Sequence, residues 1–210
     1  KATANFSKNN DSLEIFGNPV MESWEEPYMA ELAKIATSNQ GKVMEIGFGL
    51  GLSASYIQKS NIKEHHIIEA NDNVYKKLIK FSQNSTINVF SYKGLWQEQV
   101  KNFKKESFDG ILYDTYPLNE DEIHSHQFEF IKIAYDLLKH GGILTYCNFT
   151  SWGNLRKLYT NDFEMFNETQ LPQLKKIGFK RINLKQVKVN PPKKCNYYQF
   201  NTIIAPEIWK

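Results

Sequence analysis

The glycine turn at residues 47–51 constrains the fold of this chain more than any other segment. Lys42-Val-Met-Glu-Ile-Gly47 predicts a short buried strand, and glycines at 47, 49 and 51 follow it, opening a helix expected from Leu50 to Lys59. Glycines in such a turn let the backbone approach a ligand closely and expose N–H groups at the start of the helix. The turn therefore predicts a ligand site at the end of this strand.

Strands and helices alternate after the turn, which predicts right-handed crossovers and a mostly parallel sheet. Further strands are expected at His65–Glu69, Asn88–Tyr92, Phe108–Asp114 and Ile143–Cys147. Helices are expected at Pro27–Ser38, Asn73–Phe81 and Glu122–Leu138, the last stopped by Gly141-Gly142. Two longer strands, joined by residues 190–194, are expected to form an antiparallel pair at the sheet edge: Lys180–Val189 and Asn196–Ile204. Residues 1–24 show no clear element of their own.

Length and composition limit the class of protein. The chain has 210 residues, 41% of them hydrophobic and 14% aromatic, which is enough to bury the core of one ordinary domain. No stretch approaches the ~18 uninterrupted apolar residues of a membrane span. The polar start lacks the hydrophobic region of a signal peptide, and Cys147 and Cys195 are too few for a disulfide framework. We therefore expect a cytoplasmic protein with no membrane partner.

The net charge of +3 hides a split along the chain. Residues 171–210 carry +8 and residues 1–170 carry −5. A basic tail suggests nucleic acid, and an acidic body suggests a cationic ligand. The Asn-Pro-Pro word of adenine amino-methylating enzymes follows the fourth strand, whereas Asn190-Pro-Pro192 lies in the final hairpin here. We therefore interpret the tail as a solvated edge and expect no nucleic-acid partner, with a nucleic-acid methyltransferase kept as an alternative.

An acid downstream of the glycine turn limits which ligands the site can bind. Glu69 ends the next strand, 18 residues after Gly51, where a carboxylate can hold the hydroxyls of a ribose. Both a nicotinamide dinucleotide and S-adenosylmethionine fit this arrangement. A dinucleotide site requires Gly-x-Gly-x-x-Gly, whereas one residue separates Gly49 from Gly51 here. Glu45 also favours the methyl donor, and Glu45-Ile-Gly-Phe-Gly-Leu-Gly51 resembles the first motif of class I S-adenosylmethionine-dependent methyltransferases.

Longer sequence motifs resemble those of one particular family. Residues 17–29, Gly-Asn-Pro-Val-Met-Glu-Ser-Trp-Glu-Glu-Pro-Tyr-Met, closely resemble the N-terminal signature of the guanidinoacetate N-methyltransferase family. The match continues at Glu45–Gly49, Ile67–Asp72, Lys93–Trp96, Phe108–Leu118, His126–Phe128, Leu144–Asn148, Thr150–Gly153, Pro191-Pro192 and Tyr197-Tyr198. Several of these words are not general methyltransferase motifs, so the resemblance is to this family and not to the fold alone.

The resemblance implies transfer of a methyl group from S-adenosylmethionine to a guanidino nitrogen of guanidinoacetate, giving creatine and S-adenosylhomocysteine. A free guanidinium is protonated, with a pKa above ~12 as in arginine, so the site must hold a planar cation and help it lose a proton. Paired carboxylates meet this demand. Asp114 and Glu25 match the family's two guanidino-binding acids, and we assign Asp114 as the base and Glu25 to orientation and charge balance. Thr150 and Ser151, at a helix start expected after the fifth strand, offer N–H groups and hydroxyls to the substrate carboxylate.

The same resemblance implies the donor-binding residues. Met21 and Met29 resemble positions that line the sulfonium donor, and Trp96 is a candidate cover for the adenine ring; ordinary core packing is the alternative for all three. Gln97 stands where the family usually has an acid, and its amide can still bind an adenine edge. The residues predicted to bind S-adenosyl-L-methionine are Met21, Met29, Glu45, Gly47, Phe48, Gly49, Leu50, Gly51, Leu52, Ser53, Glu69, Ala70, Asn71, Trp96, Gln97 and Asp114.

We therefore expect one α/β domain over residues 1–210, a Rossmann-like class I methyltransferase. Its mostly parallel seven-stranded sheet would have helices on both faces and an antiparallel C-terminal hairpin. Residues 1–40 would form an N-terminal lid and helix, and residues 41–210 the catalytic core. No metal is expected, because His124 and His126 lack a third ligand at helical spacing. We expect a monomer or a weak homodimer.

Two further alternatives stay open. A protein arginine N-methyltransferase would share the Gly-Phe-Gly and Tyr-Asp-Thr words and use the same two acids on an arginine side chain. Against it stands the segment Asn148–Trp152, which suits a small carboxylate. A donor-binding protein without catalysis is the other alternative, and intact Asp114 and Glu25 argue against it.

Overall fold

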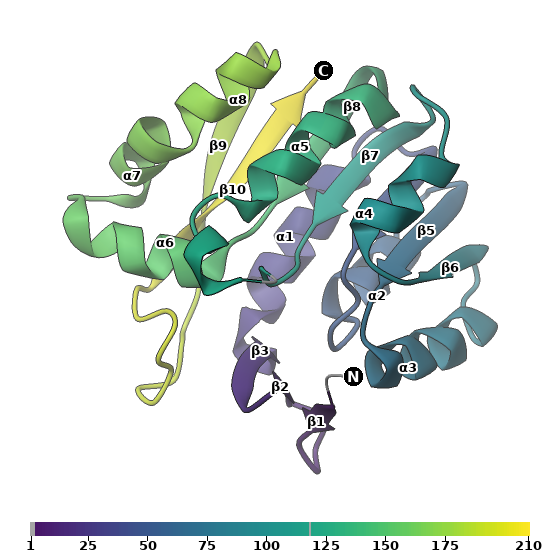
Figure 1. The fold of residues 1–210 in the computed structure, drawn as a ribbon, viewed down its shortest axis with the longest axis horizontal. Coiled ribbons are helices and arrows are strands. Elements are labelled where there is room, and N and C mark those ends of the chain that lie inside the picture. Colours follow the sequence, from purple (N-terminus) through teal and green to yellow (C-terminus); the bar gives the residue numbers. More distant parts are fainter. Residues whose placement is uncertain (1–2, 118) are drawn as a thin grey trace.

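The computed structural model describes residues 3–117 and 119–210, which surround a seven-stranded sheet of order β6-β5-β4-β7-β8-β10-β9 (Figure 1). Its strands are β4 Lys42–Ile46, β5 Glu64–Glu69, β6 Val89–Lys93, β7 Phe108–Tyr113, β8 Leu138–Tyr146, β9 Arg181–Lys188 and β10 Thr202–Trp209. Strands β4 to β8 pair in parallel, and β10 pairs antiparallel with β8 and β9. The expected class, parallel sheet and C-terminal hairpin are confirmed. Leu118, which ends one family word, lies outside the described residues.

The order of the strands places a ligand site between β4 and β7. The chain enters the sheet at β4, moves outward to β5 and β6, and then returns to the other side of β4 at β7. In an open α/β sheet, ligands bind at the carboxyl ends of the strands where the direction of winding reverses. Gly47 follows β4 and Asp114 follows β7, so the turn and the predicted base meet at this point.

Helices cover both faces of the sheet. Helix α1 packs against β7, β8, β9 and β10, whereas α5 packs against β7 and β8 from the opposite side, behind and in front of the sheet in Figure 1. Pro27 lies in the first turn of α1, where its missing N–H costs nothing. The helices are α1 Glu26–Ala36, α2 Leu52–Gln58, α3 Asp72–Gln83, α4 Trp96–Gln99, α5 His126–Leu137, α6 Phe149–Leu155, α7 Asp162–Thr169 and α8 Leu171–Ile177, with 3-10 turns at Ser23–Glu25, Val100–Asn102, Glu120–Glu122 and Arg156–Leu158. Within the described residues, none of these helices is long and apolar enough to cross a membrane.

The N-terminal segment contains a second sheet, which the sequence did not predict. Strands β1 Ala4–Phe6, β2 Ser12–Ile15 and β3 Asn18–Glu22 pair antiparallel in the order β1-β2-β3. Phe16 and Gly17, both with positive φ, form the two-residue turn between β2 and β3. The expectation that residues 1–24 lack an element is therefore wrong. Strands of three to five residues are too short for a period-two pattern to stand out.

The last two strands differ from their expected bounds. Strand β10 begins at Thr202 and not at Asn196, so the connection from β9 runs over residues 189–201. The apolar residues that bury β10 in the sheet are Ile203, Ile204, Ala205 and Ile208. Aromatic residues 197, 198 and 200 gave the connection a strand-like composition, but they pack outside the sheet, and Tyr197 contacts the N-terminal segment.

Helix α5 also differs from its expected bounds at both ends. It begins at His126 and not at Glu122, because residues 120–122 form a 3-10 turn. It ends at Leu137, before the glycines expected to stop it, because Leu138 is extended and pairs with Phe108. Gly141 and Gly142 lie inside β8, where the register with β7 shifts.

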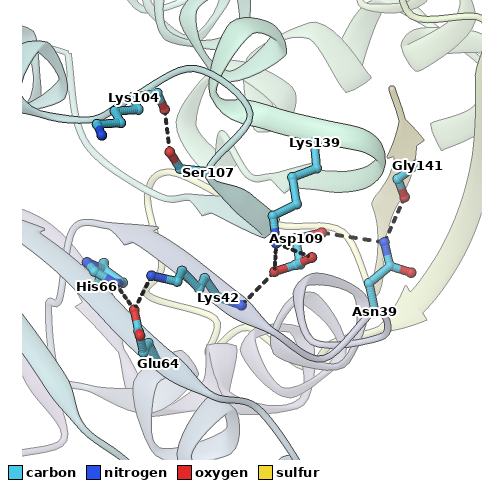
Figure 2. A network of polar contacts seen from close by, with 9 residues as sticks. All are labelled: Asn39, Lys42, Glu64, His66, Lys104, Ser107, Asp109, Lys139 and Gly141. Carbon is cyan, nitrogen blue, oxygen red and sulfur yellow. Dashed lines mark hydrogen bonds and ion pairs between the residues drawn. The ribbon is translucent and has the colours of Figure 1, made fainter.

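A polar network joins the amino ends of the strands, at the opposite edge of the sheet from the glycine turn (Figure 2). The Asp109 carboxylate accepts hydrogen bonds from Lys139 Nζ at 2.8 and 2.9 Å and from the Lys42 amide at 2.8 Å. Glu64 accepts from Lys42 Nζ at 2.8 Å and pairs with His66 at 3.0 Å. The network ties β4, β5, β7 and β8 together far from the candidate site.

Candidate active site

The glycine turn has the conformation that its sequence predicts. Gly47, Gly49 and Gly51 have φ of +88°, +53° and +79°, a region that side chains rarely adopt. A Cβ on Gly47 would lie 2.0 Å from the carbonyl oxygen of Asp114, and one on Gly49 would lie 2.9 Å from Met21 Sδ. The absence of side chains therefore lets the turn pass between β7 and the N-terminal sheet and keeps its backbone at the cavity wall.

Glu69 closes the other side of this wall. Its carboxylate accepts hydrogen bonds from the Phe48 amide at 2.9 Å and the Asn71 amide at 2.7 Å. Burial raises the pKa of Glu69, and these backbone bonds oppose the rise. The acid thereby links the glycine turn to the end of β5, beside Ala70, which also lines the cavity.

A cavity of about 630 Å³ opens at the carboxyl ends of the strands. This volume lies within the usual ~300–1,000 Å³ of small-molecule sites. The N-terminal sheet forms one wall, with residues Leu13, Ile15, Phe16, Asn18, Pro19, Val20 and Met21. The segments that follow the strands, together with the start of α3 and the β9–β10 connection, form the other wall, with residues Gly47, Gly49, Glu69, Ala70, Asn71, Asp72, Val74, Leu95, Asp114, Thr115, Tyr116, Pro117, Cys147, Asn148, Phe149, Thr150 and Tyr197.

A second cavity of about 80 Å³ shares part of this wall and is lined by the residues from Gly94 to Gln97. Within the described part of the chain, Gln97 Oε1 is buried and has no hydrogen-bond partner. Leaving a buried acceptor unpaired is costly, so this oxygen suits a donor group on a ligand. The unpaired oxygen and the side-chain-free turn both fit a nucleoside-bearing cofactor.

Asp114 lines the large cavity, and Glu25 is a buried acid near enough for the charge of Asp114 to affect its pKa. Asp114 Oδ1 accepts a hydrogen bond from Cys147 Sγ at 3.0 Å, and Glu25 Oε1 accepts from Tyr197 Oη at 2.6 Å and from the Glu22 amide at 3.0 Å. Asp114 lines the cavity, whereas Glu25 is only 2% exposed and lies behind Tyr197.

Both acids have raised pKa values. Burial raises the pKa of Glu25 to about 8; the Tyr197 hydrogen bond opposes this rise and the charge of Asp114 adds to it. Burial likewise raises the pKa of Asp114 to about 6, opposed by the Cys147 hydrogen bond and increased by the charge of Glu45. In the ligand-free protein at neutral pH, Glu25 is therefore mostly protonated and Asp114 mostly ionised. The pair then carries about one negative charge, and binding of a cation would favour ionisation of Glu25 and so a second negative charge.

The comparison with known families decides the family. The model of one family, guanidinoacetate N-methyltransferase, matches residues 1–210. The chain belongs to the guanidinoacetate N-methyltransferase family. It therefore has the domain of an S-adenosylmethionine-dependent methyltransferase, and S-adenosylmethionine is the cofactor of this domain.

Relatives and solved structures agree with the family at a coarser level. The protein arginine N-methyltransferase 2 of Candida glabrata is 31% identical over 136 residues, which are 61% of this chain and 32% of that protein. The match thus spans about a third of the length of this curated relative. A spermidine synthase in complex with the transition-state analogue AdoDATO has a TM-score of 0.65 at 18% identity, covering 99% of this chain and 71% of its own. The TYW2 protein of M. jannaschii in complex with AdoMet has a TM-score of 0.59 at 14% identity, covering 99% and 84%. At such identities, the solved structures support the class I methyltransferase fold alone.

Nine of the sixteen residues predicted for the cofactor line the two cavities: Met21, Gly47, Gly49, Glu69, Ala70, Asn71, Trp96, Gln97 and Asp114. The other seven are not among the lining residues: Met29, Glu45, Phe48, Leu50, Gly51, Leu52 and Ser53. Glu45 is fully buried and bonds to His65 at 2.9 Å and to Ser53, so both Glu45 and Ser53 lie behind the glycine turn and away from the lining. Met21 lines the cavity, and its Sδ accepts from the Leu50 amide at 3.4 Å. Met29 is fully buried in the core and lies outside the lining.

Trp96 and Gln97 lie at the smaller cavity. The Trp96 ring is 8% exposed and packs edge-on against Phe130 at 5.3 Å and Tyr113 at 6.5 Å between ring centroids. Trp96 is thus a core residue that also forms part of a cavity wall. This position agrees with core packing and leaves the ring beside a cavity. Its role toward adenine stays a prediction.

The two residues predicted for the substrate carboxylate separate. Thr150 lines the cavity. Ser151 is fully buried; its Oγ pairs with His124 Nδ1 at 2.8 Å, and its amide donates to Asn148 Oδ1 at 3.1 Å. The side chain and amide of Ser151 are thus both used inside the protein, and of the two residues Thr150 is the one in position to contact a ligand.

The two histidines considered as metal ligands have separate partners. His124 bonds to Ser151, whereas His126 pairs with Tyr113 Oη at 3.0 Å, and burial lowers the pKa of His126 to about 4. Across residues 3–117 and 119–210, no group of three or more His, Cys, Asp or Glu side chains is placed to hold a metal.

Tyr197 is the site residue that spacing alone did not reveal. It comes from the β9–β10 connection and contacts an acid 172 positions away in the sequence. The only sequence signal was the family word Tyr197-Tyr198, which names the residue without saying what its hydroxyl binds.

Proposed function

We propose that this domain is a guanidinoacetate N-methyltransferase, transferring a methyl group from S-adenosylmethionine to a guanidino nitrogen to give creatine and S-adenosylhomocysteine. One observation supports the proposal: Asp114 lines a cavity that begins at the glycine turn, and its charge adds to the rise that burial causes in the pKa of Glu25. A pair of acids close enough to raise a pKa is costly unless a cation binds there. A guanidinium is planar and offers the paired N–H groups that carboxylates bind best.

The raised pKa values divide the work between the two acids. Asp114, with a pKa of about 6, is ionised near neutral pH yet basic enough to accept a proton, which suits a general base. It would take the guanidino proton as the new C–N bond forms. Glu25, with a pKa of about 8, would lose its proton when the cation binds and then hold the guanidinium plane.

The bound cofactor supplies an electrophilic methyl group on its sulfonium. The protein contributes position: a nucleophile held in line at ~3 Å from its target can gain ~7–11 kcal/mol of barrier reduction from orientation alone. Glu69 would hold the ribose, Met21 would lie beside the sulfonium, and Gln97 would accept from the adenine edge. Thr150 would donate to the substrate carboxylate.

The N-terminal sheet would act as a lid that excludes water from both ligands, since its residues form one wall of the cavity. We propose the same lid-and-core division, residues 1–40 and 41–210, within one domain. The proposal includes a cytoplasmic monomer or weak homodimer that acts on a free small molecule and binds no nucleic acid.

A second candidate function is methylation of arginine in a protein. The observation that favours it is the similarity to proteins named protein arginine N-methyltransferase 2, of which the Candida glabrata protein is 31% identical over the matched segment. Both functions would use the same acid pair, so the two acceptors must be distinguished by the residues that surround this pair. The N-terminal sheet over the cavity supports the small molecule, because a peptide backbone would have to pass it.

The deciding experiment measures methyl transfer from labelled S-adenosylmethionine to guanidinoacetate, with free arginine, guanidine and an arginine peptide alongside. Creatine as the main product supports the proposal, and preference for the peptide refutes it in favour of the second candidate. Asp136→Asn is a matched control for Asp114→Asn, because Asp136 is an exposed acid on α5. Only the Asp114 variant should lose activity.

A further inference from the structure

Tyr197 reaches the acid pair from the far end of the chain. It lies in the connection of residues 189–201 between β9 and β10, the long yellow loop at the lower left of Figure 1. Its ring packs against Trp24, with centroids 5.8 Å apart, and against Phe149 at 6.2 Å. Trp24 belongs to the N-terminal segment and Phe149 to the start of α6, so two segments distant in sequence hold the ring in place.

The Tyr197 hydroxyl forms a hydrogen bond to Glu25. It donates to Glu25 Oε1 at 2.6 Å and lies 3.3 Å from Glu22 Oε2. Burial raises the pKa of Tyr197, followed in effect by the charge of Glu25, so the hydroxyl keeps its proton and stays a donor. A short bond from a neutral hydroxyl to a carboxylate is among the stronger hydrogen bonds in proteins.

Among the described residues, no hydrogen bond ends on the other oxygen of Glu25, Oε2. The second hydrogen bond to this side chain, from the Glu22 amide at 3.0 Å, also ends on Oε1. Among the described residues, both bonds thus hold one oxygen and fix the rotation of the carboxylate. Oε2 is then presented in a constant direction.

We propose that Tyr197 is a positioning residue for methyl transfer, which fixes the Glu25 carboxylate so that Oε2 receives the guanidinium. The inference rests on the proposed function, because it needs a guanidino acceptor at the acid pair. Tyr197 acts through Glu25 and supplies no proton to the reaction.

The same hydrogen bond links Tyr197 to the pH dependence of acceptor binding. A donor to a carboxylate favours the ionised form, so removal of the Tyr197 hydroxyl raises the pKa of Glu25. The acceptor requires ionised Glu25, and the variant therefore needs a higher pH to bind it. The other titratable groups that face Glu25 are Glu22, Asp114, Cys147 and Cys195, and none of them is changed in the variant.

The test compares Tyr197→Phe with Tyr198→Phe. Tyr198 is the neighbouring tyrosine, also packed on Phe149, but its hydroxyl donates to the Thr202 carbonyl at 2.6 Å. For each variant, kcat/KM for guanidinoacetate, free arginine and an arginine peptide is measured from pH 6 to 9, together with S-adenosylmethionine affinity by calorimetry. We expect Tyr197→Phe to lower kcat/KM for the acceptor roughly 10- to 100-fold at pH 7, the range of one hydrogen bond to a charged group. The loss should shrink toward pH 9, and donor affinity should stay within about twofold.

The outcomes separate this inference from the proposed function. Wild-type activity on the peptide instead of guanidinoacetate refutes the proposed function, and the Tyr197 comparison is then read on that acceptor. Unchanged kinetics in Tyr197→Phe overturn the inference. So does a loss that is equal at every pH and accompanied by weaker donor binding, because that result describes structural damage. If none of the acceptors is methylated, both proposals fail.

Discussion

Glu25→Gln should make the ligand-free protein more stable while it removes activity. Glu25 is 2% exposed, and its pKa rises from 4.5 to about 8, so the folded state holds a proton that the unfolded chain releases above pH 4.5. A carboxyl group with a raised pKa loses stability as pH increases from its unfolded to its folded value. The glutamine side chain has nearly the same shape and no charge to bury.

The magnitude follows from the shift. At pH 7 the wild-type protein pays about 3 kcal/mol for Glu25, from ~1.4 kcal/mol per pH unit above 4.5. The amide needs a new partner for its N–H groups, and allowing about 1 kcal/mol for this leaves about 2 kcal/mol in favour of the variant. For a chain of this length that corresponds to roughly 4–8 °C in Tm.

The assay is thermal or urea unfolding of both proteins, without ligands, at intervals from pH 5 to 8. The two stabilities should nearly coincide at pH 5 and separate steadily toward pH 8. Glu14→Gln is the control, because Glu14 is an exposed acid on β2 of the same segment. A Glu25→Gln protein that is less stable than wild type at pH 7, or a difference that does not depend on pH, would refute the burial argument.

Three further predictions concern the cavity wall. Asp114→Asn should abolish turnover, because the base is lost, while calorimetry still detects S-adenosylmethionine binding; appreciable activity would remove Asp114 from the role of base. Gly47→Ala places a Cβ 2.0 Å from the Asp114 carbonyl oxygen, so it should lower the free energy of unfolding by on the order of 3 kcal/mol and abolish donor binding. Gly141→Ala, at φ +74° but in open space, should lower the free energy of unfolding by only about 1 kcal/mol in a urea titration. Equal costs would contradict the clash. Cys147→Ala removes the thiol that lowers the pKa of Asp114, so the acid limb of the rate profile should move to higher pH, and Cys147→Ser should keep it near the wild-type position; superimposed profiles would show that the thiol has no such effect.

The parallel part of the fold could be predicted from the sequence because each strand tip carries its own signal. A short strand at residues 42–46 is followed by glycines, and Glu69 and Asp114 each stand at the end of a strand. Once the sheet is parallel, these features must meet at its carboxyl edge. The direction of a side chain at such a tip is harder to predict. Glu45 lies within β4, where a shift of one residue turns a side chain to the other face, and it points to His65 and Ser53 instead of the cavity.

The remaining features depend on contacts between distant segments. The N-terminal strands are too short to show a period, and the connection 189–201 carries aromatic residues that serve the site and not the sheet. Nothing local distinguishes Tyr197 from Tyr198, yet one bonds to Glu25 and the other to Thr202. The Ser151 hydroxyl is likewise held inside the protein by His124, a partner 27 residues away, whereas Thr150 lines the cavity.

The contact between the N-terminal segment and the 189–201 connection means that the donor-binding turn and the Glu25 side chain are held by parts of the fold that differ in stability. The glycine turn and Glu69 stand on central strands that are hydrogen-bonded on both sides, and such strands open only with the whole domain. Glu25 and Tyr197 meet where two segments outside the central sheet touch, so their contact depends on the local stability of these segments. The glycine turn and Glu69 are therefore expected to stay in place if the contact between Glu25 and Tyr197 opens, so a change at that contact would alter the acceptor site and leave this part of the donor site formed.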